Sequence, residues 1–109
     1  MGGDTRSIMR IAKKELTGEI YKKVDSITDR VERENSLKYI LFADLENKCY
    51  LLGKKIQYLK QYKKDVFFAE VKYLFLQGKL NHFKSSFGKK DYIKIKKAMD
   101  ELKEEIKNV

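Results

Sequence analysis

The side chains that most often act as nucleophiles or general bases are few in this sequence and poorly spaced for catalysis. His82 is the only histidine, and Ser85 and Ser86 follow it too closely to form a catalytic triad. Cys49 is the only cysteine, and it falls where the pattern of apolar residues requires one more. We therefore expect no enzymatic activity, with His82 near a solvent-facing helix end and Cys49 packed as a small apolar residue.

The same scarcity argues against a bound metal or cofactor, and we expect neither. One cysteine and one histidine cannot form a structural zinc site, and no stretch has the spaced carboxylates of a calcium loop. Residues 84–90 contain two serines, a glycine and three lysines ahead of an expected helix, which is where a phosphate would fit best. They lack the paired glycines of a phosphate-binding loop, so we expect an ordinary exposed loop with Gly88 at positive φ.

The positive charge is concentrated in the middle of the chain. Residues 1–47 carry nine basic and nine acidic side chains, whereas residues 48–97 carry fourteen lysines and three acidic residues. The net charge of +9 therefore comes from this central part, and such an excess attracts polyanions or acidic protein surfaces. The residues expected to make this contact are Lys48, Lys54, Lys55, Lys60, Lys63, Lys64, Lys84, Lys89, Lys90, Tyr58 and Tyr62.

Lysines interleaved with tyrosines suit contact with the phosphate backbone and base stacking on a single strand. Bidentate reading of bases needs arginine, and all four arginines, Arg6, Arg10, Arg30 and Arg33, lie in the neutral half. We expect a non-enzymatic interaction module of a nucleic-acid-handling assembly, in replication, repair or RNA metabolism. The open alternatives are an acidic protein partner, an anionic membrane surface, lysines that only add solubility, and a homo-oligomeric structural protein.

These side chains must be positioned by helices. The chain has no proline and six glycines, and its apolar residues recur at spacings of three and four. We expect one all-α domain over residues 1–109, an antiparallel bundle of about four helices, two of them long, near residues 5–32, 36–63, 66–83 and 92–109. Gly18 lowers the helix propensity of the first segment and permits a kink there, and the expected caps are Asp4, Ser36, Asp65 and Asp91.

The helix expected at 66–83 is apolar on two sides. One stripe continues the core, and the other contains Phe67, Val71, Leu74 and Phe75. A helix of this kind lies either at the centre of a bundle or in an oligomer interface. We therefore expect these four residues to line the bundle centre or a homodimer interface.

The sequence also predicts a compartment. The single cysteine favours a reducing environment, and neither a secretory signal nor a membrane-spanning run is present. We expect a cytoplasmic protein.

Residues 65–81, DVFFAEVKYLFLQGKLN, resemble the motif of a short archaeal helical-hairpin family of unknown function. In that family Lys-Gly-Asp-aromatic precedes a helix ending in Tyr-Ala-His-Gly-x-Leu-Asp. Lys64 stands in place of the glycine and Gln77 in place of the histidine. The positions that follow the pattern are Asp65, Ala69, Phe75, Gly78, Leu80 and Asn81.

The wider hairpin, residues 45–83, is similar to the HEPN helical family, many members of which are ribonucleases that need Arg-x4–6-His. Phe75, Leu76 and Gln77 occupy the positions before His82 where that arginine would stand. The resemblance therefore implies a helical hairpin without the nuclease chemistry.

Residues 19–24, EIYKKV, resemble the acidic-aromatic-Tyr-x-x-Val stretch in the helical domain of archaeal GINS replication subunits. The basic Arg-x-x-Lys-Ile helix end common in that family is missing. This resemblance implies a helical domain that works in a replication assembly.

Overall fold

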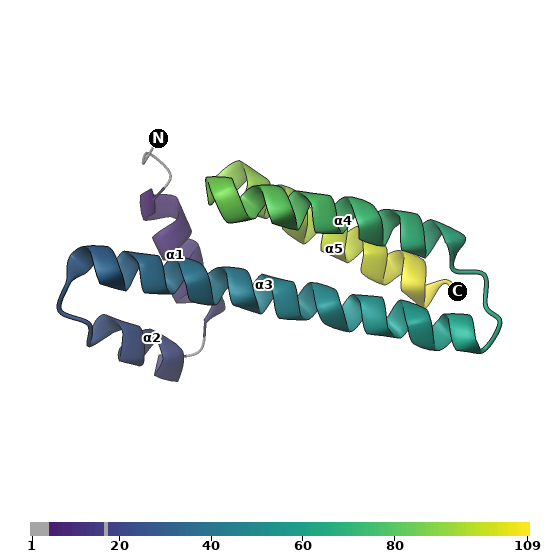
Figure 1. The fold of residues 1–109 in the computed structure, drawn as a ribbon, viewed down its shortest axis with the longest axis horizontal. Coiled ribbons are helices and arrows are strands. Elements are labelled where there is room, and N and C mark those ends of the chain that lie inside the picture. Colours follow the sequence, from purple (N-terminus) through teal and green to yellow (C-terminus); the bar gives the residue numbers. More distant parts are fainter. Residues whose placement is uncertain (1–4, 17) are drawn as a thin grey trace.

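The computed structural model describes residues 5–16 and 18–109, with their side chains except at 5–7 and 21. These residues form five helices, which confirms the predicted all-α class (Figure 1). No helix of the described chain has the length and apolar character needed to cross a membrane. The helices are α1 (Thr5–Glu15), α2 (Gly18–Asp25), α3 (Arg30–Gln61), α4 (Phe67–Ser86) and α5 (Lys89–Lys107).

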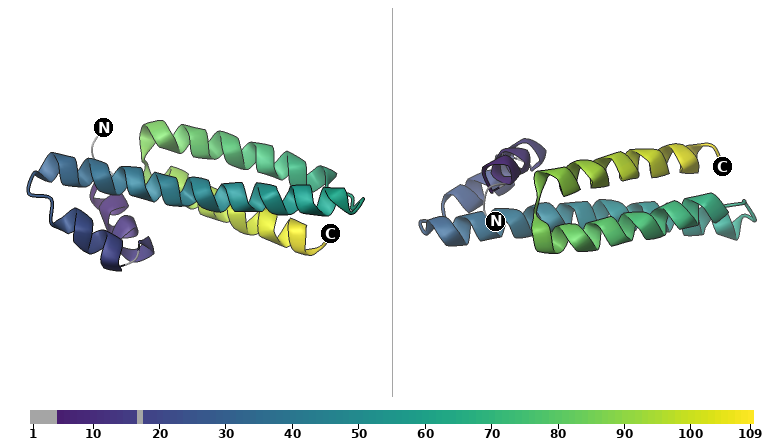
Figure 2. Two further views of the ribbon diagram at one scale, coloured as in Figure 1. Left: turned by 60° about the horizontal axis from the view of Figure 1, so that its bottom comes forward. Right: turned by 90° about the horizontal axis from the view of Figure 1, so that it is seen from above.

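The long helix α3 is the centre of the molecule and contacts all four other described helices. Its 32 residues extend for about 48 Å, close to the 52 Å length of the whole structure. Helix α4 runs antiparallel to α3 beside its second half, α5 runs back antiparallel to α4, and α1 and α2 pack on the first half of α3 (Figures 1 and 2). Of the two places predicted for the helix near 66–83, the bundle centre is therefore taken by α3, and the oligomer interface stays a prediction.

The core is built from the predicted stripes. The residues that α3 buries follow one another at intervals of three or four, and they meet similar stripes on α4 and α5. The side chains buried most completely in this contact are Leu41, Leu45, Leu76, Phe83, Ile95, Met99 and Leu102.

The first predicted helix, near 5–32, is wrong as a continuous element. Helix α1 ends at Glu15, α2 begins at Gly18, and a second interruption separates α2 from α3. Ile8, Ala12 and Val24 are buried as the stripe predicts, but Val31 is 64% exposed. Because the helix is interrupted twice, two short helices can fold back onto α3. One straight helix over residues 5–32 would have left part of its apolar stripe exposed. The predicted cap Asp4 lies outside the described residues.

Helix α3 begins six residues before the predicted cap at Ser36. The Asp29 carboxylate accepts a hydrogen bond from the Val31 backbone N–H at 2.9 Å and so caps the helix. Residues 34–36 interrupt the apolar stripe, yet the helix passes through them because Asn35 is exposed and its neighbours are half-buried. Polar residues on an exposed helix face do not end a helix.

The two corners of the bundle differ from each other. Between α3 and α4, Lys63 has a φ of 59°, and the Asp65 carboxylate accepts a bond from the Phe67 N–H at 3.2 Å, as predicted. Between α4 and α5 the positive φ of 45° belongs to Phe87, whereas Gly88 has a φ of −83°. The predictions of a long 84–90 loop and a positive-φ Gly88 are therefore wrong.

The contacts at the end of α4 explain why the positive φ lies at Phe87 and not at Gly88. The Phe87 N–H bonds to the Phe83 carbonyl, and the two rings lie 5.0 Å apart. This ring contact accompanies the left-handed backbone at Phe87. Asp91, predicted as a cap, lies inside α5, where its carboxylate accepts a hydrogen bond from the Ser86 hydroxyl.

Candidate polyanion interface

The structure does not bring the predicted lysines onto one surface. Lys48 and Lys55, two turns apart, share one face of α3, and Lys60 lies on another. Two of these ammonium groups already have carboxylate partners, Lys48 with Asp44 at 2.8 Å and Lys60 with Glu70 at 3.4 Å.

Lys54 lies within α3, with its Nζ 5.6 Å from the centre of the Tyr50 ring, and the other five predicted lysines divide between the two ends of α4. Lys63 and Lys64 lie at the α3–α4 corner, and Lys84, Lys89 and Lys90 lie at the α4–α5 corner. Because α4 has 20 residues, the two groups are about 30 Å apart. One copy of the chain therefore presents two separate basic clusters rather than a single one.

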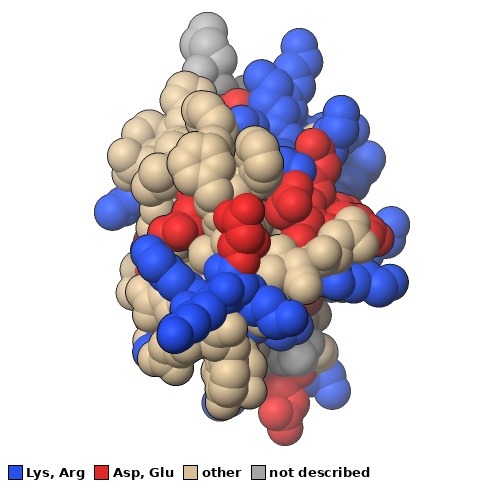
Figure 3. Space-filling view, turned by 90° about the vertical axis from the view of Figure 1, so that its right-hand side faces the viewer, with Lys and Arg blue, Asp and Glu red and all other residues tan. Residues whose placement is uncertain are grey.

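The α3–α4 corner has exposed aromatic rings but a mixed charge. Tyr58 and Tyr62 are 59% and 63% exposed, with ring centroids 4.9 Å apart. Helix α5 ends at this end of the molecule (Figure 1), and its last turns carry Glu104 and Glu105 together with Lys103 and Lys107. Figure 3 shows the result, with acidic side chains lying among the basic ones. Acidic side chains here weaken the attraction of the corner lysines for a polyanion.

A more concentrated group of lysines lines a groove of about 360 Å³ between α4 and α5, which we call the lysine groove. Lys72 and Lys79 are seven residues apart on α4, and Lys94 and Lys97 are three apart on α5, so each pair shares a helix face. The antiparallel packing of α4 on α5 brings the two pairs together. The other lining residues are Phe75, Ala98 and Glu101.

The contacts inside the lysine groove leave most of its charge available. Lys72 Nζ lies 2.9 Å from Glu105 Oε1, and Lys79 Nζ lies 5.9 Å from the centre of the Phe75 ring. Lys94 and Lys97 are exposed. Four lysines stand against Glu101 in the lining and Glu105, which pairs with Lys72, so the groove has a net charge of +2. A positive groove with an exposed ring at its edge can hold phosphates and offer a stacking surface.

These four lysines were not among the residues singled out by the sequence analysis. Their spacings of seven and three do indicate a shared face within each helix. Nothing in the local pattern indicates that the two faces meet, because that depends on how α4 packs against α5.

A second groove, of about 800 Å³, runs between α3 and α4, and its lining is mostly uncharged. Glu46 and Lys84 balance each other there, and Asn47, Gln77 and Asn81 supply amide groups. Further along, a Cβ added at Gly53 would lie 2.5 Å from the Tyr73 hydroxyl oxygen, so glycine is needed there for close packing. This groove has no excess charge with which to attract a polyanion.

The remaining chemical candidates have the environments that were predicted for them. Cys49 is buried, and burial together with the nearby Glu46 carboxylate raises the pKa of its thiol to about 11. His82 is exposed near the end of α4, with Nε2 3.4 Å from an Asp91 carboxylate oxygen. Within residues 5–16 and 18–109 no group of three or more His, Cys, Asp or Glu side chains could hold a metal ion.

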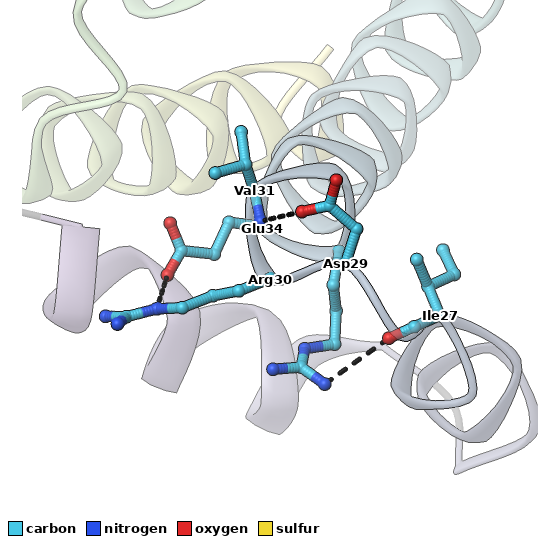
Figure 4. A network of polar contacts seen from close by, with 6 residues as sticks. Ile27, Asp29, Arg30, Val31 and Glu34 are labelled. Atoms are coloured by element: carbon cyan, nitrogen blue, oxygen red, sulfur yellow. Dashed lines mark hydrogen bonds and ion pairs between the residues drawn. The ribbon is translucent and has the colours of Figure 1, made fainter.

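The arginines of α3 are engaged at the start of that helix (Figure 4). Arg30 Nε donates to a Glu34 carboxylate oxygen at 3.2 Å, and Arg33 donates to the Ile27 carbonyl at 3.4 Å. Arginine groups that could read base edges are thus placed on another helix from the lysine groove. Comparisons of the chain with protein-family models, with curated proteins and with solved structures found no match.

Proposed function

We propose that this protein is a non-catalytic module that binds single-stranded nucleic acid through the lysine groove and contacts phosphates without reading sequence. The observation that carries the proposal is the convergence of Lys72, Lys79, Lys94 and Lys97 on one groove. Ammonium groups attract phosphates of any sequence, and the exposed Phe75 ring beside them offers a surface on which a base can stack.

The charge balance favours the lysine groove over the α3–α4 corner. At the corner, Lys60 is paired with Glu70, and the end of α5 adds further carboxylates. In the groove, Glu105 pairs with Lys72, but Lys79 contacts an aromatic ring, which leaves its positive charge uncancelled. Tyr58, Tyr62, Lys63 and Lys64 remain the alternative contact predicted from the sequence.

The direct test is fluorescence anisotropy of labelled single-stranded oligonucleotides of about 20 nucleotides and unrelated sequences, at about 50 mM salt. We expect similar affinity for all sequences and weaker binding to a duplex of the same length. The slope of log affinity against log salt should be about −2 to −3, because each phosphate contact on a single strand contributes about −0.7. An absence of binding at about 50 mM salt would contradict the proposal.

Three double variants with the same change in charge locate the contact. Lys94→Glu/Lys97→Glu alters the groove, Lys63→Glu/Lys64→Glu alters the corner, and Lys22→Glu/Lys23→Glu alters an exposed pair on α2. We expect the groove variant to weaken binding at least tenfold more than the α2 variant. Equal losses in all three would show a response to net charge alone, and a larger loss at the corner would move the site there.

Two further probes separate the proposal from the other polyanion partners. Vesicles containing anionic lipid and an acidic polypeptide such as polyglutamate are compared with the oligonucleotide at the same salt concentration. A preference for the oligonucleotide supports the proposal, because only the nucleic acid supplies bases for Phe75. A preference for either of the other two would contradict it.

A further inference from the structure

The outward face of α4 carries a row of apolar residues that its own chain does not cover. Phe67, Val71, Leu74 and Gly78 follow one another at intervals of four, three and four, and we call this row the α4 seam. Phe67 is 63% exposed and Leu74 is 67% exposed, whereas Val71 is half-buried. Phe68 and Phe75, seven residues apart, flank the seam and are 66% and 65% exposed.

We propose that the α4 seam pairs with the same seam of a second copy of this chain in antiparallel orientation. We further propose that the pairing joins the lysine grooves of both copies on one face of the dimer. The first part stands on the apolar surface alone, and the second part rests on the proposed function.

The spacing of the seam is that of a helix-packing surface. Apolar residues at alternating intervals of four and three form the contact line of paired helices. The core stripe of α4, with Ala69, Leu76, Leu80 and Phe83, lies on the opposite side of the helix and is already used within the chain. The seam is therefore a second packing surface, and no helix of the described residues packs along it.

Gly78 gives an independent reason to expect a partner helix. Glycine in a helix interior is less favourable than alanine, and a Cβ added at Gly78 would meet no described atom within 4 Å apart from its sequence neighbours and the backbone of its own helix. No close packing within the protein requires a glycine there. A small residue on an exposed helix face does allow the backbone or a large side chain of another helix to approach closely.

The area of the patch fits a second copy of the chain. Phe67, Phe68 and Leu74 each present roughly 100 Å² of apolar surface, so one copy offers about 300 Å² without Phe75, which lines the lysine groove. Two copies together bury about 600 Å² of this surface, and the rest of the facing helices brings the interface toward the roughly 1,000–1,200 Å² of a specific complex. A symmetric dimer covers the patch on both copies with one interface.

The sizes of the side chains favour the antiparallel orientation. When Val71 faces Leu74 of the second copy, Phe67 faces Gly78, so the largest seam residue meets the smallest. A parallel pair would place Phe67 against Phe67, where two large rings are crowded, and Gly78 against Gly78, where a gap remains. The antiparallel pair fills both positions, because each Phe67 then packs against a Gly78.

The antiparallel arrangement also determines where the lysine grooves of the two copies lie in the dimer. Phe75 lies on the side of the seam nearest α5, and in an antiparallel pair the two equivalent sides face each other. Both α5 helices, and with them both lysine grooves, then lie on the same face of the dimer. The two Lys79 residues are offset by 13 residues along the paired helices in this register, which is about 20 Å. A single strand can therefore contact both grooves.

Bringing two basic grooves together opposes dimer formation when no polyanion is present. Salt screens this repulsion, so dimerisation should strengthen as salt increases. Binding of the single strand should weaken over the same range. Dimerisation and single-strand binding should therefore change in opposite directions as the salt concentration rises, so one salt series distinguishes them.

Sedimentation equilibrium over a range of concentrations and salt tests the dimer itself. We expect the wild type to dimerise and its dissociation constant to fall by at least threefold from about 50 mM to about 500 mM salt. Leu74→Glu should be monomeric, whereas Leu51→Glu, the same change at a 55% exposed leucine on α3, should dimerise like the wild type. A wild type that stays monomeric up to about 1 mM would overturn the proposal.

Cross-linking tests the register. Val71→Cys and Leu74→Cys are made in a Cys49→Ala background, mixed and oxidised. An antiparallel pair gives mainly the mixed 71–74 disulfide, because these positions face each other. A parallel pair gives mainly 71–71 and 74–74 disulfides, and that result would overturn the antiparallel part of the proposal.

Oligonucleotides of two lengths test the joining of the grooves. A strand of roughly 20 nucleotides should lower the dimer dissociation constant at least tenfold, and a strand of roughly 8 should have little effect, because it reaches one groove. If both strands bind but neither changes the dimer, the joining of the grooves is overturned. If neither strand binds although the dimer forms, the proposed function fails and the self-pairing of α4 stands.

Discussion

At the scale of single residues, Cys49 shows how a reactive side chain becomes part of the core. It is 2% exposed among the leucines that α3 buries, and its pKa is raised to about 11 because burial penalises the thiolate and Glu46 lies nearby. At neutral pH the thiol is therefore uncharged and packs as a small apolar group. The apolar spacing along the sequence had already predicted this role.

The raised pKa of Cys49 predicts a loss of stability at alkaline pH. The unfolded thiol ionises near pH 9.0 and the folded thiol only near 11, so ionisation lowers the free energy of the unfolded state relative to the folded state as the pH rises through this interval. We expect the free energy of unfolding to fall by about 1 kcal/mol between pH 8 and pH 10 through this group. Denaturant unfolding at both pH values measures the change.

The control for this prediction is Cys49→Ala, which removes the ionising group. Its stability should fall less over the same interval than that of the wild type. Burial also raises the pKa values of Tyr73 and Tyr92, but their unfolded forms ionise near 10.0, so they act mainly above the interval. An identical pH dependence in the variant would show that Cys49 does not contribute.

At the scale of the helices, the start of α3 is a case where capping outweighed the apolar pattern. The sequence pattern favoured Ser36 as the cap, because the stripe is interrupted just before it. In the structure Asp29 caps the helix, and two further polar contacts, from Arg30 and Arg33, surround the same turn. Helix α3 is thereby extended, and its first half provides the surface on which α1 and α2 pack.

Two alanine variants compare the two candidate caps directly. Asp29→Ala should lower the free energy of unfolding by about 1 kcal/mol, because the Val31 N–H loses its acceptor. Ser36→Ala replaces a residue inside the helix and should leave stability unchanged or raise it by about 0.5 kcal/mol. Thermal unfolding of both variants measures the difference, and the reverse order of stabilities would place the helix start at Ser36.

At the scale of the whole molecule, the length of α3 makes the protein elongated. The described chain measures 52 × 29 × 17 Å and has a Cα radius of gyration of 15.9 Å. A compact domain of 109 residues would have a value of about 13 Å. The elongated shape exposes a large share of α4 and separates the two corner lysine clusters.

Small-angle X-ray scattering of a monomeric sample tests this shape. For Leu74→Glu we expect a radius of gyration of about 16–17 Å at all concentrations, slightly above the Cα value because of side chains and hydration. The wild type should give the same value only when dilute, with a larger one at high concentration. A value near 13 Å for the variant would contradict the elongated arrangement.

The sequence by itself determined the helical class, the core stripes of all three long helices and the apolar role of Cys49. These are local properties, because spacings of three and four decide which side chains share a helix face. The sequence also identified Phe67, Val71, Leu74 and Phe75 as a second apolar face, but it left open whether that face was central or external.

Only the tertiary structure decided the rest. It placed α3 rather than α4 at the centre, broke the first helix so that α1 and α2 fold onto α3, and separated the predicted lysines into distant groups. It also brought Lys72 and Lys79 to Lys94 and Lys97, which lie in another helix. The reason is physical: local spacing orders side chains around one helix, whereas the contact between two helices depends on how well distant faces pack together.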